Sequence, residues 1–508
     1  MKYIIFEITF CTLCLGVLAC TPTPSHTSNN QPVDLYMDMY IPDSMISNTD
    51  SMTPMNDQLL DTMNDSTLDL ALHVDMNDLD MATDMITDTW QDVIQSTVGV
   101  MQIRTDGVDI DERIEDRSWV HANVLLFVDD EARKQNQHMW QGPAAIHIRG
   151  NSSADYEKKQ YALEMRDEQD QDVDVSLFNL PPEEDWVLHA PYSDKTLMRN
   201  YLMYRWSRSI GRYAPRSYFI ELYVKSDAGA FTEQDYRGVY IVMEKIKRDP
   251  YRVNIEKFTH QSEDVPITEG SYLLKRDWVE GDVITTELYE DELTLVHPKL
   301  SQISDAQWEW IEEDLNRFES ALEQDDGSYV EHIEVDSFVD HMLMMELSRN
   351  VDAYVLSTFM HKKKSGSLTM GPIWDFNGSL GNANYFLSWE PEGWHYENPE
   401  FPADNPNGFR WYEALLQDPI FQQRLADRWT AHRAGPWSNE LLMEDIDQVA
   451  DLLQNVHVRN FERWPILGEH IWPNDEGAES RTSYQEEIEY LKTWLLARLA
   501  WLDLQLLR

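Results

Sequence analysis

Hydrophobic and polar positions follow two different periods along the chain. Between residues 98 and 245, short or alternating apolar runs are typical of β-strands. From about Trp308 onward, apolar residues recur at intervals of three and four, which is the period of an amphipathic helix. We therefore predict an α+β fold with N-terminal strands and a largely helical C-terminal part. The predicted strands cover Val98 to Ile103, Asn123 to Val128, Ala144 to Ile148, Tyr161 to Met165, Tyr218 to Val224 and Gly238 to Lys245.

The helical period also locates the main helices. An early helix carries Leu197, Tyr201 and Ile210, and Ser193 or Asp194 can cap its first turn. The later helices are expected at about 308–322, 336–349, 420–432, 438–453 and 484–507. Their apolar stripes are typical of faces that pack on a core, so we expect packing rather than ligand contacts from these residues.

The stretch from Met344 to Asn384 brings two acidic residues together. The helix that ends near Asn350 leaves Asp352 on a loop, and loops held by rigid elements often carry catalytic side chains. Two short strands flank the basic turn Lys362–Gly366, which predicts a β-hairpin that folds Asp375 back beside Asp352. Because neighbouring carboxylates repel each other, such a pair usually means a metal ion, a shared proton or another cation.

The same stretch has the parts of a phosphoryl-transfer site. Such sites use an aspartate that accepts the proton of the substrate hydroxyl, a side chain about five residues on that helps to hold metal, and an aspartate after a hairpin that holds Mg²⁺ against the phosphates. In this chain those parts are Asp352, Ser357 and Asp375. A metal-dependent hydrolase that uses the two aspartates is the weaker alternative, because the chain lacks the histidine clusters that would favour it.

A second group of residues has the chemistry to contact phosphate. The RGNSS turn follows a strand at Arg149, and Asn151 with the small residues beside it lets backbone N–H groups approach an anion. Lys158 or Lys159, just before the next strand, can reach phosphate as a point charge. From spacing alone, the turn can equally be a hairpin with solvated lysines. Glu244, at the end of a later strand, either pairs with such a lysine or is a solvated strand end.

The first twenty residues predict export. Met1 to Cys20 carries Lys2, an apolar run and VLAC, and it resembles a bacterial lipoprotein signal in which Cys20 is lipidated. The apolar run is short for a membrane span and is interrupted by Glu7, although an uncleaved N-terminal anchor is the alternative. All three cysteines lie in this leader, so the mature chain is expected to have no intrachain disulfide and no thiolate metal site.

Residues 21–97 are rich in Asp, Met, Thr, Ser and Asn and contain almost no basic residues. Such a composition cannot bury enough apolar surface to offset chain entropy, so we predict a disordered, self-repelling tether between the lipid and the folded domain. A calcium-binding array is the alternative, because clusters such as DMND supply oxygen ligands. The glycine and the closing glutamate of a calcium loop are absent, which favours the tether.

The charge of the chain limits its partners. Its formal net charge at pH 7 is −50, and the domain contributes to it as well as the tether. A nucleic-acid partner is not expected, because a phosphate backbone is bound by clustered Lys and Arg. A basic, Ser/Thr-rich protein segment would instead be attracted to this surface.

Several motifs in a fixed order carry a family resemblance. They are IRGNSSADYEKKQYAL (148–163), DWVLHAPYSDKTLMRNYL (185–202), APRSYFIELYV (214–224), GVYIVMEKIK (238–247), GSYLLKRD (270–277), the Asp352 region and GPIWDFNGSLGN (371–382). Through them the chain resembles the CotH kinase family, the spore-coat protein H-like secreted kinases with an atypical protein-kinase fold. The resemblance implies a kinase-like domain at 144–508, with residues 98–143 as strands leading into it.

The resemblance also implies roles for the acidic residues. Asp352 would align the acceptor hydroxyl and take its proton, and Asp375 would hold Mg²⁺ or Mn²⁺. Asn377 and Ser357 would assist in holding metal, although family members often carry Asp at the first position and Asn at the second. Both side chains still offer oxygen ligands, so a weaker second metal site is the expected consequence.

The remaining motif residues would contact ATP. The residues that the resemblance assigns to ATP are Arg149, Asn151, Arg199, one of Lys158 and Lys159, and Glu244, which would position that lysine. The predicted function is therefore a lipid-anchored, extracytoplasmic protein kinase that transfers the γ-phosphoryl group of ATP to Ser or Thr. The alternative is a catalytically weak or inactive relative that acts as a structural or adhesive surface lipoprotein. It is favoured by Ser357 and Asn377, which replace the residues usual in the family, and by the scarcity of ATP outside the cytoplasm.

Overall fold

The structure is a computed structural model that describes residues 95–112, 117–259, 270–278, 281–324, 326–398 and 410–507. All of these residues lie in one unit of the chain, Asp75–Arg508. The predicted signal at 1–20, including Cys20, and all of the predicted tether except residues 95–97 lie outside the described residues. None of the described helices is long and apolar enough to cross a membrane.

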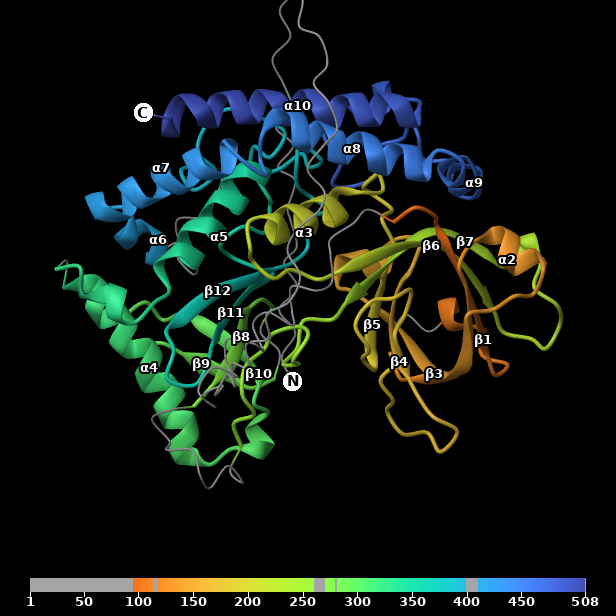
Figure 1. Ribbon diagram of the computed structural model, residues 1–508, viewed down its shortest axis with the longest axis horizontal. Helices are drawn as coiled ribbons and strands as arrows, with labels where there is room; N and C mark the ends of the chain where they lie inside the picture. Colours follow the sequence, from red (N-terminus) through yellow and green to blue (C-terminus); the bar gives the residue numbers. More distant parts are fainter. Residues whose placement is uncertain are drawn as a thin grey trace, which may run out of the picture. The chain divides into compact units, whose positions relative to one another are not determined.

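Seven strands form a closed barrel in the order β1-β2-β3-β4-β5-β7-β6 (Figure 1). Most neighbours are antiparallel, and the barrel closes where β1 pairs with β6 in parallel. Alternate residues such as Met101, Ile103 and Ile146 are fully buried and fill the interior, which is why the apolar runs of the sequence form these strands. The strands are β1 (Gly99–Thr105), β2 (Val120–Phe127), β3 (Trp140–Arg149), β4 (Gln160–Met165), β5 (Asp185–His189), β6 (Ser217–Lys225) and β7 (Tyr236–Glu244).

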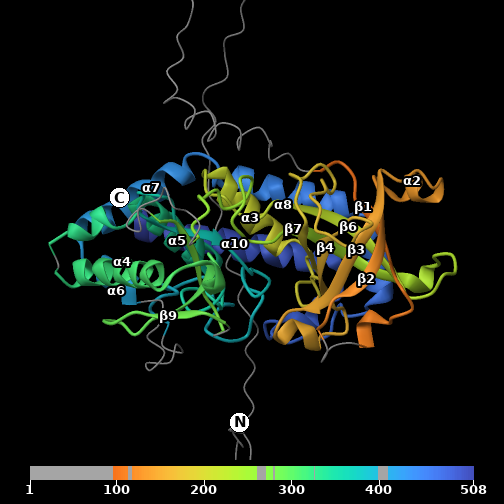
Figure 2. The same cartoon turned by 90° about the horizontal axis from the view of Figure 1, so that it is seen from below.

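A second sheet contains five antiparallel strands in the order β12-β11-β8-β10-β9. Strands β11 and β12 are the predicted hairpin, which is confirmed. Helix α5 packs against β12, and α4 lies on the same side of the molecule (Figures 1 and 2). The elements are β8 (Tyr272–Arg276), β9 (Val283–Thr285), β10 (Glu292–His297), α4 (Asp305–Glu323), α5 (Val335–Ser348), β11 (Thr358–Lys362) and β12 (Leu368–Ile373).

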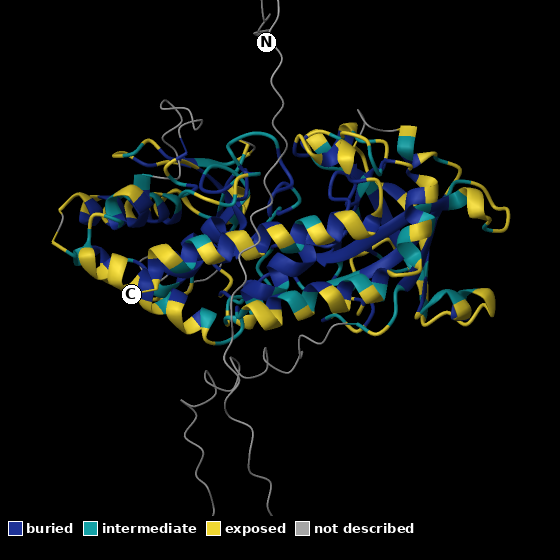
Figure 3. Ribbon diagram, turned by 90° about the horizontal axis from the view of Figure 1, so that it is seen from above, coloured by how far each residue is buried: buried dark blue, intermediate teal, exposed yellow. Residues whose placement is uncertain are grey.

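The C-terminal part is helical, as predicted, and it joins the two sheets. Helix α9 packs against β7 of the barrel, whereas α10 packs against α5, α7 and α8. The long helix α10 shows alternating buried and exposed positions in Figure 3, because one stripe faces the core. The other helices are α2 (Asp130–Lys134), α3 (Arg199–Ser209), α6 (Arg410–Leu415), α7 (Pro419–Arg433), α8 (Asn439–Leu453), α9 (Val456–Arg463) and α10 (Tyr484–Leu506).

The prediction for the start of α3 was wrong. The helix begins at Arg199, and Leu197 adopts a left-handed backbone conformation with φ of +65°. Asp194 does not cap a helix that begins beside it. Its carboxylate instead accepts the backbone N–H of Arg199 at 2.8 Å and pairs with the Arg199 guanidinium at 2.6 Å.

Two domain boundaries predicted from the sequence can be compared with contacts in the structure. The division at 143/144 falls inside β3, whose hydrogen bonds to β2 and β4 cross it, so the barrel does not divide there. Gln95, near the end of the predicted tether, already contacts the barrel: its side-chain amide exchanges two hydrogen bonds with the backbone of Phe219 in β6.

A buried ion pair connects α10 to α5. Arg498 donates from Nε to the carbonyl of Glu346 at 2.8 Å, and its Nη2 lies 3.2 Å from the Glu346 carboxylate. That carboxylate also accepts the Tyr354 hydroxyl at 2.8 Å and the backbone N–H of His395 at 2.7 Å. Burial raises the pKa of Glu346 and lowers that of Arg498 to about 9. The network therefore fixes the segment that leaves α5.

Replacing Arg498 with Met should lower the free energy of unfolding by about 3 kcal/mol, because Glu346 then remains buried without its charged partner. Urea unfolding followed by circular dichroism measures the change. Lys492→Met on the same helix is the matched control. Lys492 pairs with Asp447, whose side chain is 59% exposed, so its loss should change the stability by less than about 1 kcal/mol. Equal losses in the two variants would contradict the structural role of the buried pair.

Candidate active site

A cavity of about 1030 Å³ lies where the barrel, α3 and the β11–β12 hairpin meet. Its lining comes from segments far apart in the sequence: the turn after β3, the start of α3, the end of β8, the loop after α5 and the loop after β12. The volume is at the upper end of the range for small-molecule sites. The predicted site residues that the structure brings together in this cavity are Arg149, Asn151, Asp352, Ser357, Asp375 and Asn377.

Asp352 lies on the short segment between α5 and β11. Helix α5 ends because Arg349 adopts a left-handed conformation, with φ of +45°. The carboxylate of Asp352 accepts the hydroxyl of Ser357 at 3.2 Å, so the predicted catalytic residue and one predicted metal ligand are already in contact. Ser357 also has a positive φ, +52°, a strained conformation for a residue other than glycine.

Asp375 lies two residues after the end of β12 and is held through its backbone. Its φ is +61°, its N–H donates to the Tyr204 hydroxyl at 3.2 Å, and its carbonyl accepts the Asn350 amide at 2.9 Å. The backbone contacts leave the carboxylate available to the cavity. Strained residues of this kind cluster at functional sites, where the surrounding contacts maintain them.

A chain of hydrogen bonds from the barrel positions the residue after Asp375. The N–H of Phe376 donates to Asn200 Oδ1 at 2.6 Å, and Asn200 Nδ2 lies 3.0 Å from His189 Nε2. Burial lowers the pKa of His189 to about 3, so its ring is neutral. Nε2 therefore accepts from Asn200, and Nδ1–H donates to Gln160 Oε1 at 2.9 Å. Asn200 was not among the site residues predicted from the sequence, because its link to Phe376 depends on the packing of α3 against the loop after β12.

Both aspartates carry charge that the protein does not fully compensate. Burial raises the pKa of Asp352 to about 7, with a further contribution from the charge of Asp375. Burial raises the pKa of Asp375 to about 6, against the opposing effect of Arg149. The Arg149 guanidinium lies over the ring of Trp374, 5.5 Å from its centroid. Arg149 is the cation that lowers the pKa of Asp375, while Arg117 and Lys275 also line the cavity.

Asp277 is a third carboxylate on the cavity wall, and it was missed as a site residue. It follows β8, in the GSYLLKRD motif, and its charge raises the pKa of both Asp352 and Asp375. Lys275 lies 3.1 Å from its carboxylate and also lines the cavity. The signals in the sequence were an acidic residue immediately after an apolar strand and the motif that contains it, and neither indicated the pairing of β8 with β11.

The two predicted phosphate-binding lysines do not line the cavity. Lys158 donates from Nζ to the carbonyl of Val239 at 2.6 Å and to Asn460 Oδ1 at 2.9 Å, so it ties β7 to α9. Its burial lowers its pKa well below the usual range. Gly238 permits this approach, because with φ of +102° any Cβ would lie 2.6 Å from Asn460 Oδ1. Lys159 donates to the carbonyl of Ala154 at 2.8 Å and braces the RGNSS turn.

Glu244 and Arg199 also have structural partners. The expected ion pair between Glu244 and a lysine is corrected: Glu244 pairs with Arg216 at 2.9 Å and accepts the Tyr213 hydroxyl at 3.0 Å. Arg199 does not line the cavity either. Its guanidinium donates from Nε to the carbonyl of Ser379 at 3.0 Å, so it supports the loop after Asp375 from behind.

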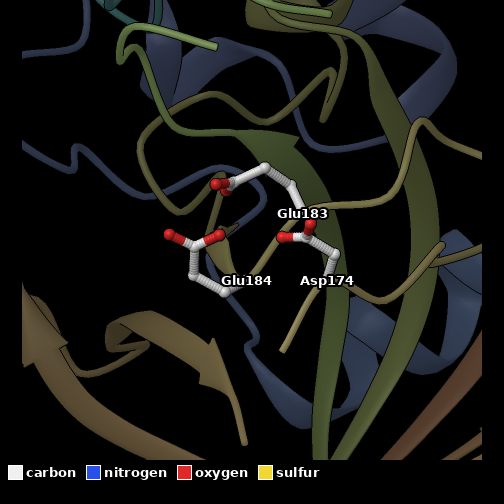
Figure 4. A group of neighbouring side chains, drawn as sticks. All are labelled: Asp174, Glu183 and Glu184. Atoms are coloured by element: carbon white, nitrogen blue, oxygen red, sulfur yellow. The ribbon is translucent and has the colours of Figure 1, made fainter. Parts of the chain in front are cut away.

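One acidic group outside the cavity has the spacing of a metal site. Among the described residues, Asp174, Glu183 and Glu184 have ligand atoms within 4.8 Å of one another, and Figure 4 shows the three carboxylates converging. Lys247 already supplies a cation there, with Nζ 2.7 Å from Glu183 and 2.6 Å from Glu184. None of these residues lines the cavity, so this group is not the predicted metal site.

The cavity itself suits a hard divalent cation. Asp375, Asp352, Asn377 and Ser357 offer oxygen ligands to a metal. Burial, and after it the charge of neighbouring aspartates, raises the pKa of Asp352 and Asp375, and a bound cation would offset both effects. Mg²⁺ and Mn²⁺ prefer such ligands, and Mg²⁺ is commonly held by one or two carboxylates together with substrate phosphates. The residues present therefore fit the expected metal.

Comparison with protein families gives one match. The family model described as CotH kinase protein matches residues 146–502, from within β3 to within α10. No curated protein matched the chain. The match includes Arg149, Asp277, Asp352 and Asp375, and it confirms the family that the motifs indicated.

The carboxylate pair should make the metal-free protein less stable as the pH rises. Both pKa values are higher in the folded protein than in the unfolded chain, so stability falls between about pH 4 and pH 7. Asp375→Asn removes one charge and should raise the free energy of unfolding at pH 8, without metal, by about 1 kcal/mol. Urea unfolding at pH 5 and pH 8 measures this. Asp451→Asn, on the exposed face of α8, is the control. A lower free energy of unfolding for Asp375→Asn at pH 8 would contradict the repulsion between the carboxylates of Asp352 and Asp375.

Proposed function

The chain belongs to the CotH kinase family, and on this premise we propose that it is an extracytoplasmic protein kinase that transfers the γ-phosphoryl group of ATP to Ser or Thr. The observation that supports this best is the single cavity in which Arg149 faces Asp277, Asp352 and Asp375. Phosphoryl transfer depends on positioning and on neutralising phosphate charge, and this lining offers both.

Asp352 is the proposed catalytic base. Its carboxylate is directed by the Ser357 hydroxyl, and its pKa of about 7 lies near neutral pH, where a base can accept the proton of an acceptor hydroxyl. Asp375, with Asn377, would hold Mg²⁺ or Mn²⁺. When bound, the metal would neutralise developing charge on the phosphates. The backbone contacts of Asp375 fix the main chain from which this carboxylate projects.

The ATP phosphates would lie against the turn after β3. Arg149 supplies a guanidinium fork that suits phosphate, and Asn151 and Ser153 line the cavity beside it. Gly150 has φ of +99°, and a Cβ there would lie 2.0 Å from Ser153 Oγ, so the tight turn requires glycine. Trp278 and Trp472, which are 60% and 52% exposed, also line the cavity and offer ring faces for the adenine.

The acceptor is proposed to be a Ser/Thr-rich, basic segment of a secreted or surface protein. The net charge of −50 would attract such a segment and would repel nucleic acid. The lipidated Cys20 and the acidic tether would hold the kinase at the surface of a bacterial membrane, at a distance set by the tether. These assignments depend on residues outside the described part of the chain.

Incubation of the full chain with γ-labelled ATP, Mg²⁺ or Mn²⁺ and a Ser-rich basic peptide tests the reaction. Asp352→Asn and Asp375→Asn should each lower the rate of label transfer at least about 100-fold, because they remove the base and the principal metal ligand. Glu184→Gln is the matched control, since its carboxylate lies outside the cavity. Full transfer by Asp375→Asn would refute the assignment.

The same assay separates the alternatives. Nucleotide binding without label transfer in the native protein would indicate the inactive relative that serves as a structural or adhesive surface protein. Release of free phosphate without protein labelling would indicate the hydrolase.

Cys20→Ala should move the protein from the membrane fraction to the soluble fraction, because the lipid attachment point is lost. Cell fractionation and labelling with a radioactive fatty acid measure the change. Cys14→Ala, in the same leader, should retain both label and membrane association. Membrane association of Cys20→Ala without fatty-acid label would indicate an uncleaved N-terminal anchor.

A further inference from the structure

Among the described residues, Lys275 is the one lysine that lines the cavity of Asp352 and Asp375. Phosphoryl-transfer sites commonly use a lysine beside the nucleotide phosphates, but Lys158 and Lys159 have structural partners elsewhere. Lys275 belongs to β8, which lies between β10 and β11 in the second sheet (Figure 1). Because β8 pairs with a strand on each side, the backbone at Lys275 is held in a fixed position.

The side chains of Lys275 and Asp277 project from one face of β8. Successive side chains of a strand point to opposite faces, so Arg276 points the other way. Arg276 is buried and its Nε donates to Asp291 at 3.0 Å, whereas Lys275 and Asp277 both line the cavity. Lys275 Nζ lies 3.1 Å from an oxygen of Asp277, and the two side chains are 22% and 25% exposed. This ion pair therefore lies at the surface of the cavity rather than in the core.

The pairing of β8 with β11 brings the end of β8 close to the proposed base. Thr358 of β11 lies opposite Arg276, so the next position along the two strands places Ser357 beside Asp277. Ser357 donates its hydroxyl to the carboxylate of Asp352 at 3.2 Å. Burial, and after it nearby negative charge that includes Asp277, raises the pKa of Asp352, in agreement with this closeness. The end of β8 thus lies beside the base.

The ion pair leaves Lys275 able to bind a phosphate. An ammonium group has three N–H donors, and the hydrogen bond to Asp277 uses one of them. Protein kinases hold their phosphate-binding lysine with an acidic side chain, so a pair of this kind orients the lysine without preventing it from contacting phosphate. Asp277 can therefore do for Lys275 what Glu244 was expected to do for Lys158 or Lys159.

We propose that Lys275 binds the γ-phosphate of ATP and that Asp277 positions its ammonium group. This inference rests on the proposed function, because that function places the ATP phosphates in this cavity. The γ-phosphate has to lie beside the base, since the acceptor oxygen attacks it there, and the end of β8 is next to that base. Arg149, on the turn after β3, would then contact the α- and β-phosphates.

The role of Lys275 in the reaction is electrostatic. During transfer, the bond between the γ-phosphorus and the oxygen that bridges to ADP breaks, and a bond to the Ser or Thr oxygen forms. The hydroxyl proton passes to Asp352, and ADP leaves with the bonding electron pair. Lys275 stays on the non-bridging oxygens of the transferred group, so its positive charge offsets their negative charge and the lysine itself keeps its protons.

Binding of two nucleotides to the full chain tests this assignment without requiring catalysis. Isothermal calorimetry with Mg²⁺ compares ADP with AMP-PNP, an ATP analogue whose β–γ bridge is an N–H group that resists transfer. Lys275→Met and, as an independent replacement, Lys275→Gln should each weaken AMP-PNP binding at least about tenfold. Each should weaken ADP binding less than about threefold, because only the analogue carries a γ-phosphate.

Lys362→Met is the matched control. Lys362 lies on β11 of the same sheet and pairs with Asp314 at 2.6 Å, but it does not line the cavity. Its loss should change neither affinity by more than about twofold. Thermal unfolding verifies that each variant is folded.

The outcomes separate this inference from the proposed function. If the native protein does not bind AMP-PNP, the proposed function is refuted, and this inference with it. If the native protein binds AMP-PNP but the Lys275 variants bind it equally well, or lose ADP and AMP-PNP to the same extent, this inference alone is refuted. Equal weakening of AMP-PNP binding by Lys362→Met would also refute it.

A double-mutant cycle tests the positioning role of Asp277. The measured quantity is the ratio of AMP-PNP affinity to ADP affinity. Asp277→Asn should lower this ratio at least about threefold more in the native background than in the Lys275→Met background, because only the native background has a lysine to orient. The removal of a negative charge near the phosphates acts in both backgrounds and cancels. Equal effects in the two backgrounds would refute the positioning role, since a purely structural change lowers thermal stability without altering the ratio.

Discussion

The structure depends on keeping two mutually repelling carboxylates, Asp352 and Asp375, in one half-buried cavity. Electrostatic repulsion and the loss of hydration both oppose this arrangement, as the raised pKa values of the pair show. Three side chains fix the main chain at Asp375 and Phe376: Asn350 donates to the Asp375 carbonyl, and Tyr204 and Asn200 accept the N–H groups of Asp375 and Phe376. The two side chains therefore stay close together although the cations of the cavity neutralise them only in part.

This arrangement explains why rigid elements surround the site. Asp352 follows α5, and α5 is anchored to the C-terminal helix α10 through the buried pair of Glu346 and Arg498. Asp375 follows β12, whose hairpin is completed by β8 of the second sheet. The two aspartates therefore reach the cavity from elements that cannot separate without breaking the core. The positive φ of Asp375 is an unfavourable backbone conformation, and the surrounding packing stabilises it.

Local patterns in the sequence predicted the parts of the site that depend on neighbouring residues. The end of α5, the hairpin and the return of Asp375 toward Asp352 all follow from helical period, strand period and a basic turn, and the structure confirms the hairpin. The mixed α+β class, most of the barrel strands and the long C-terminal helices were predicted for the same reason. The strands were recognisable because they fill one barrel interior.

Contacts between distant residues could not be predicted in the same way. Lys158 looked like a phosphate ligand, but its partner Asn460 lies 302 residues away and meets it only because α9 packs on the barrel. Glu244 pairs with Arg216 rather than with a lysine, because β6 and β7 are neighbours in the closed barrel. Asp277 was missed because nothing in the sequence shows that β8 pairs with β11. The spacing of residues along the sequence indicates which reaction they could support, whereas tertiary packing decides which side chains face the cavity.

Barrel closure also affects how this protein can associate with other β-rich proteins. Pairing of β1 with β6 leaves no open strand edge in the described barrel. In the second sheet, the outer side of β12 is partly covered: Leu368 exchanges hydrogen bonds with the backbone of His332 and Glu334, and the N–H of Met370 donates to the Ser337 hydroxyl. The remaining edge is β9, which is three residues long. Association by strand addition is thus limited, in the described sheets, to a very short segment, which protects the protein from edge-to-edge aggregation.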